Sequence, residues 1–521
     1  MTDPRPTGHP LPQVPSVPGL ARPRCVRGLA GLAGLLQILM AAAGATAEPG
    51  SGKQLRQGLD LVNPPALQRA ADYLATTWPE VCGPQLPGWK KDLDQLQARL
   101  EDLRRRLASD DSQAIAETRA ALDLQRRILL ANPLLRDFSS VLLVRRSANN
   151  LGLPPNWESN CGLPRTGYDN DLAVLAPFSP EAPLRTLYRP ADDTFVGDVD
   201  LHFDASRLLF SKSDPAKPWQ VFELKIDGSG LRQVTPDMGA DVDNYDACYL
   251  PNGEVLFGST ATMVAVPCVN GAANVADIYR LSADGKQVRQ LCFDQEHNWC
   301  PTVLNNGKVL YLRWEYTDLP HSNSRRLFQM NPDGTGQALF YGTSSYWPNG
   351  VFFARPIPGH PTEVAGIVTG HHGVPRMGEL VIFDPQRGRS EAEGAVQRIP
   401  GWGRKVERVV KDAVADASWP KFLHPYPLGR PTGEGSGKCF LVACQPTPES
   451  LWGIYLVDVF DNLLLLREEP GYALLEPIPI QPRPAPPIIP DRVQPERKDS
   501  LVYLVDVYAG PGLRGIPRGE V

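Results

Sequence analysis

Near the start of the chain, apolar and polar residues recur with the period of amphipathic helices. In the clearest run, leucines lie three or four positions apart among Arg, Glu and Asp: Leu93, Leu96, Leu100, Leu103 and Leu107. This spacing places them on one helical face. A second run extends from Ile115 to Leu130, and Asn132-Pro133 ends it. Together with a segment at 65–78, the pattern predicts a helical N-terminal segment over residues 48–135 that contains a helical hairpin.

From about residue 139 the pattern changes to short apolar strands separated by polar turns. One such unit occurs three times, at 201–210, 249–257 and 303–311, with a turn of Asp or Asn and Gly or Ser between two strands. A second unit that ends in Asp-Gly follows each copy. The Asp residues of these second turns lie 57 and 49 residues apart, at Asp227, Asp284 and Asp333. Two hairpins of this kind form one four-stranded blade of a β-propeller with inserted loops.

Weaker copies extend the series at 141–144, 172–175, 379–384, 453–458 and 502–507. The sequence therefore predicts an all-β fold, a β-propeller of six or seven blades over residues 136–521, whose last blade we expect to be incomplete. The Pro-rich segment 477–490 cannot pair as a central strand, so we expect it to be an extended crossover between blades.

The first 47 residues have the pattern of an export signal. Arg22, Arg24 and Arg27 precede the apolar run 29–43, and Ala45-Thr46-Ala47 provides small residues for cleavage. We expect the mature chain to begin near Glu48 and to be periplasmic or secreted. The competing interpretation is an uncleaved membrane anchor. No later segment is apolar enough to span a bilayer.

Composition narrows the possible partners and the compartment. A net charge of −5 with no basic patch argues against nucleic-acid binding. Of the nine cysteines, Cys25 lies within the signal, and the other eight would reach an oxidising compartment. Their spacing leaves the pairing open.

Several segments point to a known family. They are Asn298-Trp299-Cys300-Pro301, 312–321, Gly370-His371-His372-Gly373, 419–425 and 452–462. With the Asp/Asn-Gly hairpins, they resemble the Tol-type and WD-like repeats of exported bacterial propellers. They are more closely similar to the propeller region of hydrazine synthase alpha subunit-like proteins of planctomycete-type bacteria. The likeness covers about residues 130–521.

The resemblance implies a propeller followed by a region that carries c-type haem on Cys-x-x-Cys-His. This chain contains no such motif, so we expect no covalent c-type haem and regard the haem-bearing part as missing. The resemblance therefore implies ancestry and fold more than hydrazine-forming chemistry.

Histidines cluster in one part of the chain, and six of the eight lie between His297 and His424. Imidazole and thiolate are ligands for a transition metal such as zinc. The candidate ligands are His297, Cys300, His321, His371, His372 and His424. The alternative is that these side chains only form hydrogen bonds or fill the core. The same choice, between a ligand pocket and the core, applies to Trp299, Trp314 and Trp347.

The first functional hypothesis is a binding or scaffold module for a protein or a small ligand outside the cytoplasm. A propeller suits this role because its rigid blades bring distant loops together around an axis. The alternative is a metal-dependent or redox enzyme component that uses Cys300 and the His-rich loops.

Overall fold

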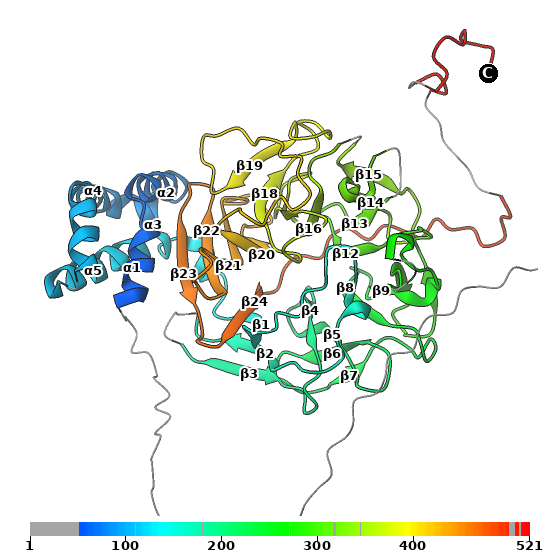
Figure 1. Ribbon diagram of the computed structural model, residues 1–521, viewed down its shortest axis with the longest axis horizontal. Helices are drawn as coiled ribbons and strands as arrows, with labels where there is room; N and C mark the ends of the chain where they lie inside the picture. Colours follow the sequence, from blue (N-terminus) through cyan, green and yellow to red (C-terminus); the bar gives the residue numbers. More distant parts are fainter. Residues whose placement is uncertain are drawn as a thin grey trace, which may run out of the picture. The chain divides into compact units, whose positions relative to one another are not determined.

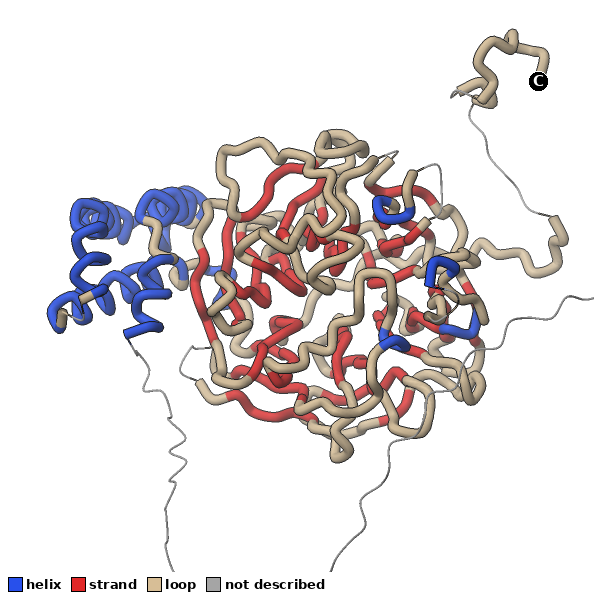
Figure 2. Tube along the Cα trace, viewed as in Figure 1, coloured by secondary structure: helices blue, strands red, loops and turns tan. Residues whose placement is uncertain are grey.

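The computed structural model describes residues 52–109, 111–178, 182–269, 271, 273–315, 319–343, 345–499, 506–509 and 512–521. The predicted export signal lies outside these residues. Five helices precede the first strand: α1 (Gly52–Asp60), α2 (Pro64–Thr77), α3 (Pro79–Cys82), α4 (Leu86–Ala108) and α5 (Ser112–Leu129). Figure 2 shows them together at one side of the strands.

The helices form where the sequence pattern places them. All five leucines of the predicted face are buried along α4. The carboxylate of Asp111 accepts hydrogen bonds from the backbone N–H groups of Gln113 and Ala114, so it caps α5. Helix α1 lies within the helical segment predicted over residues 48–135.

The rest of the fold is a propeller of six four-stranded antiparallel sheets, which agrees with the predicted six or seven blades. The first blade contains β1 (Val141–Ser147), β2 (Asn170–Leu175) and β3 (Leu184–Tyr188) with β24 (Tyr472–Pro479). The second contains β4 (Val196–Leu201), β5 (Arg207–Lys212), β6 (Gln220–Lys225) and β7 (Arg232–Gln233). The third contains β8 (Asn244–Tyr249), β9 (Val255–Ser259), β10 (Asp277–Leu281) and β11 (Val288–Gln290).

The fourth blade contains β12 (Asn298–Val303), β13 (Val309–Trp314), β14 (Arg325–Met330) and β15 (Ala338–Tyr341). The fifth contains β16 (Gly350–Pro356), β17 (Val364–Thr369), β18 (Glu379–Phe383) and β19 (Ala395–Ile399). The sixth contains β20 (Lys421–Pro427), β21 (Cys439–Gln445), β22 (Gly453–Asp458) and β23 (Leu463–Arg467). Figure 1 shows β24, β4, β8, β12, β16 and β20 closest to the central axis.

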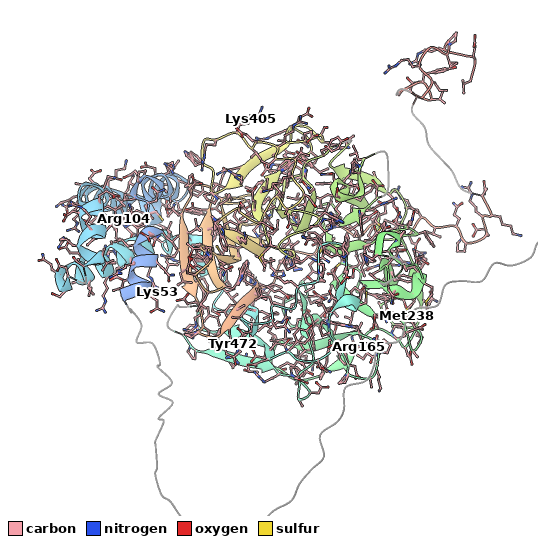
Figure 3. All side chains as sticks on the ribbon, viewed as in Figure 1. Lys53, Arg104, Arg165, Met238, Lys405 and Tyr472 are labelled. Carbon is pink, nitrogen blue, oxygen red and sulfur yellow. The ribbon has the colours of Figure 1, made fainter. Side chains whose placement is uncertain are left out.

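The two ends of the propeller meet in the first blade. Strand β24, which begins at Tyr472 (Figure 3), pairs antiparallel with β1, from Val141 opposite Pro479 to Ser147 opposite Tyr472. The last strand of the propeller thus completes the blade that the first three strands begin. This pairing closes the ring and leaves β1 without a free edge.

The helices pack on the sixth blade and share its core. The Gln125 amide donates to the Leu463 carbonyl at 3.2 Å, and the Asn462 amide donates to the Ala66 carbonyl at 3.0 Å. Leucines of α2, α4 and α5 belong to the same apolar cluster as β21 and β22. The helical segment is therefore anchored to the propeller by burial and by buried polar bonds.

The Pro-rich segment corrects one expectation. Pro477 and Pro479 lie in β24, an innermost strand with a partner on one side only, where a missing N–H is tolerated. Residues 481–490 follow the last strand and do not join two blades. The Arg483 N–H donates to the Phe203 carbonyl at 2.8 Å, and the Arg492 N–H donates to Asp333 at 2.6 Å. After β24, the chain therefore lies against the second blade at Arg483 and against the fourth blade at Arg492. Most of the predicted strand at 502–507 lies outside the described residues.

Two further observations concern the described residues as a whole. None of their helices has the length and apolarity to cross a membrane. The seven cysteines whose side chains are described are free thiols, including Cys439 and Cys444 on β21.

Candidate functional site

The innermost strand of every blade contains a β-bulge at the same position. In each pairing, two residues of the innermost strand oppose one residue of the next strand. The first residue of each bulge has φ between 50° and 54°: Glu476, Asp198, Asp246, Cys300, Phe353 and His424. A bulge redirects a side chain, and these six residues all line one narrow cavity of about 70 Å³. We call them the bulge ring.

A second tier of side chains that line the central space lies two residues after the bulge residue on each strand. Its members are Ile478, Asp200, Cys248, Thr302, Arg355 and Tyr426. All but Ile478 line a larger cavity of about 1040 Å³. We call this tier the mouth ring and the larger space the mouth cavity.

Carboxylates of the bulge ring bond the neighbouring blade. Glu476 accepts hydrogen bonds from the backbone N–H groups of Asp198 at 3.2 Å and Val199 at 2.6 Å. Asp246 accepts from the Cys300 N–H at 2.7 Å. Because a bulge interrupts the strand ladder, these acids satisfy N–H groups that the bulges leave unpaired.

Burial shifts the protonation of the bulge ring. Desolvation raises the pKa of Asp246 and of Glu476 to about 7, and it raises the pKa of Asp198 as well. Desolvation also raises the pKa of Cys300 far above its usual value and lowers the pKa of His424 to about 3. At neutral pH the ring therefore contains a protonated thiol, a neutral imidazole and partly protonated acids.

The two cavities together form a channel. The loop at residues 156–161 closes the end of the channel opposite the mouth cavity. The Asn160 amide donates to Asp198 at 2.6 Å. The Arg376 guanidinium donates to the Glu158 carbonyl and lies 4.0 Å from the centre of the Phe352 ring. On the innermost strands, these contacts involve residues at or before the bulge. The mouth cavity is instead lined by residues that come after the bulge in the sequence. The channel is therefore closed at this end and open at the mouth cavity.

The structure separates the predicted metal ligands into two groups. Cys300 and His424 both line the narrow cavity. Phe353 of the fifth blade lies between them in the bulge ring. The imidazole of His424 lies 4.2 Å from the Phe353 ring. The remaining histidines that the structure describes lie elsewhere.

Aromatic contacts hold this second group at the closed end. His297 stacks on Trp299 at 4.8 Å, and its Nδ1 accepts a hydrogen bond from the Ala276 N–H at 3.0 Å. His371 packs against His372 at 4.3 Å, and His372 Nδ1 lies 2.6 Å from the Asp412 carboxylate. The side chain of His321 is not among those described. Across the described residues, no three His, Cys, Asp or Glu side chains are placed to hold one metal ion, so the zinc site stays a prediction.

The three candidate tryptophans are buried. Trp299 and Trp314 stack 6.2 Å apart, and Trp299 Nε1 donates to the Ser159 hydroxyl at 2.7 Å. Trp347 is 1% exposed and lies 5.9 Å from the Phe383 ring. None of the three lines the mouth cavity as described.

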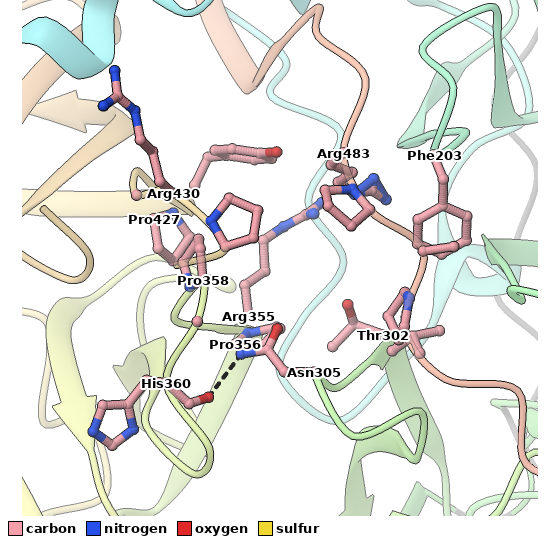
Figure 4. Close-up of a pocket in the computed structure, with 18 of the residues that line it drawn as sticks. Phe203, Thr302, Asn305, Arg355, Pro356, Pro358, His360, Pro427, Arg430 and Arg483 are labelled. Atoms are coloured by element: carbon pink, nitrogen blue, oxygen red, sulfur yellow. Dashed lines mark hydrogen bonds between the residues drawn. The ribbon is translucent and has the colours of Figure 1, made fainter. Parts of the chain in front are cut away.

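The mouth cavity is formed by loops that follow the innermost strands and by the Pro-rich segment. Figure 4 shows its lining from several blades, including Phe203, Thr302, Pro356, Pro427 and Arg483. The amide of Asn305 donates to the carbonyl of His360 at 2.7 Å, which ties the loops of the fourth and fifth blades together. Prolines and aromatic rings make part of its wall rigid and apolar, and charged and amide side chains form the rest.

Comparisons with known proteins agree with this architecture. No protein-family model and no curated protein sequence matches the chain. Hydrazine synthase from Kuenenia stuttgartiensis is similar over 69% of this chain and 49% of its own, with 15% identity and a TM-score of 0.52. This propeller resembles part of hydrazine synthase. The resemblance predicted from the sequence is thus confirmed at the level of the fold, and the chain spans about half the length of the hydrazine synthase chain.

TolB from Acinetobacter baumannii is also similar, over 70% of this chain and 72% of its own, with 11% identity and a TM-score of 0.38. A TolB-related protein from Agrobacterium tumefaciens is similar over 50% of this chain, with 13% identity and a TM-score of 0.33.

Sequence reasoning missed most of the channel lining. Cys300 and His424 were candidates, but Asp198, Asp246, Glu476 and Arg355 were not. For Asp246 and Glu476 a signal exists. In five blades the bulge residue lies four positions before an apolar residue near the end of the strand: Leu250, Leu304, Ile357, Leu428 and Ile480.

Proposed function

We propose that the chain is an exported binding module whose ligand enters the mouth cavity. The observation that supports this proposal most directly is a cavity of about 1040 Å³ at the open end of a channel that is closed at its other end. Small-molecule sites are typically concave spaces of about 300 to 1,000 Å³ with apolar walls and a few polar groups. The mouth cavity is about this large, and its wall combines prolines and aromatic rings with charged and amide side chains.

The rigidity of the lining favours binding. Prolines at 356, 358, 427, 431 and 482 fix the backbone around the opening. A wall that is ordered before the ligand arrives loses little conformational entropy on binding. In the same proposal, the predicted hairpin at 89–131 carries no chemistry and packs on the sixth blade.

Export is part of this proposal. Cleavage after Ala47 would release a chain that begins near Glu48. Intact-mass measurement of the protein from its native cells tests this point, because an uncleaved chain would contradict it.

Binding is tested with N-phenyl-1-naphthylamine, a neutral apolar probe that fluoresces when it leaves water. We expect saturable binding to the purified chain. Thr302→Trp places a large side chain in the mouth ring, and we expect it to weaken probe binding by roughly tenfold because the indole takes up space where the probe would lie. The measurement is a fluorescence titration.

The matched control is Lys286→Trp, on an exposed turn of the third blade whose side chain is 78% exposed. It introduces the same ring outside the cavity and should leave the titration unchanged. Equal binding to the wild type and to Thr302→Trp would contradict the proposed site.

A further inference from the structure

The mouth ring contains one acid and one base on opposite sides. Asp200 belongs to β4 in the second blade, and Arg355 belongs to β16 in the fifth. In a ring of six, two blades lie between them on either side, so they face each other across the channel. Burial raises the pKa of the Cys248 thiol, so this member of the mouth ring is uncharged at neutral pH.

Arg355 differs from the other two arginines that line the mouth cavity. Arg430 forms ion pairs with Asp137 at 3.1 Å and with Glu434 at 2.9 Å. Arg483 donates to the Leu201 carbonyl at 3.0 Å and lies 3.9 Å from Asp200. For Arg355, the described residues provide no carboxylate within 4.0 Å. Its guanidinium lies 5.5 Å from the centre of the Tyr426 ring, and Figure 4 shows the side chain extending into the cavity.

The acid opposite is already engaged. Asp200 accepts a hydrogen bond from the Tyr249 N–H at 2.9 Å, and Arg483 lies beside it. Its charge is therefore partly neutralised inside the protein. The available charge of the mouth ring is the guanidinium of Arg355.

We propose that the mouth cavity selects an apolar organic anion, whose carboxylate or sulfonate pairs with Arg355. This inference rests on the proposed function, because it names the class of ligand for the same cavity. A planar guanidinium can donate two parallel hydrogen bonds to such an anion. The apolar body of the ligand would lie against Tyr426, Phe203 and the prolines of the wall.

The charges below the mouth ring set the position of the anion. Asp198, Asp246 and Glu476 of the bulge ring line the narrower channel underneath. The cavity they line holds only about 70 Å³ and presents carboxyl groups, so an organic anion is disfavoured there and stays in the mouth cavity. The anionic group is therefore held on the side of the fifth blade, next to Arg355.

A pair of probes that share one ring system tests the inference. 8-Anilinonaphthalene-1-sulfonate carries a sulfonate that N-phenyl-1-naphthylamine lacks. For Arg355→Gln in the full chain, we expect affinity for the sulfonate probe to fall roughly 10- to 100-fold, the value of a charged hydrogen-bonded contact. Affinity for the neutral probe should change less than about threefold. Arg355→Lys, which keeps the charge but loses the paired geometry, should lie between wild type and Arg355→Gln.

The matched control is Arg408→Gln, at an arginine outside the cavity that is 60% exposed. It should bind both probes as the wild type does. If Arg355→Gln binds the sulfonate probe as well as the wild type, or loses both probes equally, the anion inference is wrong while the binding site can stand. If the wild type binds neither probe, both proposals are overturned.

Discussion

The acids of the bulge ring contribute to folding in a pH-dependent way. Burial raises the pKa of Asp246 and of Glu476 to about 7, above their ordinary values of 3.8 and 4.5. Between these values and pH 7, the folded chain holds protons that the unfolded chain releases. The contribution of these groups to the free energy of unfolding is therefore largest at low pH, and it falls as pH rises through about 7.

The variant Asp246→Asn tests this dependence. The amide oxygen can still accept the Cys300 N–H, but the group no longer titrates. We expect the loss of stability between pH 5 and pH 8 to be smaller than in the wild type, by on the order of 1 kcal/mol. Chemical denaturation at both pH values measures it. The control is Asp94→Asn, on the exposed face of α4, and identical pH profiles for all three proteins would refute the assignment.

Residue chemistry was only partly predictable from the sequence. The search for histidines and cysteines found Cys300 and His424, because those side chains are chemically distinctive. It could not show that they occupy equivalent bulges, since a bulge depends on strand pairing and an apolar residue four positions later does not by itself mark one. Arg355 is missed for a similar reason. It stands out because no described carboxylate pairs with it, and only the fold reveals this.

At the scale of elements, local turn chemistry made the central blades predictable. Asn252-Gly253 and Asn306-Gly307 sit in the first turns of the third and fourth blades, and both glycines have positive φ. In the fifth and sixth blades, the loops between the first two strands run from Ile357 to Glu363 and from Leu428 to Lys438. These longer loops lack an Asn-Gly pair. The sequence therefore indicated those two blades only through their third strands.

The closing strand was not predicted, because its pairing joins residues more than 300 positions apart. Leu474 of β24 is fully buried and belongs to the main apolar cluster. We expect Leu474→Ala to lower the free energy of unfolding by about 2 to 5 kcal/mol, the usual cost of a cavity in a packed core. Denaturant titration followed by circular dichroism measures the change.

The comparison variant is Leu231→Ala, at a leucine that is 45% exposed. Its effect should stay within about 0.5 kcal/mol. A similar small effect for Leu474→Ala would mean that β24 does not close the first blade.

At the scale of the whole propeller, the bulge ring and the mouth ring line a site whose two ends differ. The repeated bulges supply the geometry, while the different residues at equivalent positions supply the charge pattern. The loop at 156–161 closes one end, and the Pro-rich segment borders the other. A ligand can therefore be recognised by groups from several blades at once.

The location of a bound probe tests this account most directly. A crystal structure of the chain with 8-anilinonaphthalene-1-sulfonate should show the probe in the mouth cavity, with its sulfonate on the Arg355 guanidinium and its rings against Tyr426. A probe bound only elsewhere on the protein, with the mouth cavity filled by water, would contradict the account.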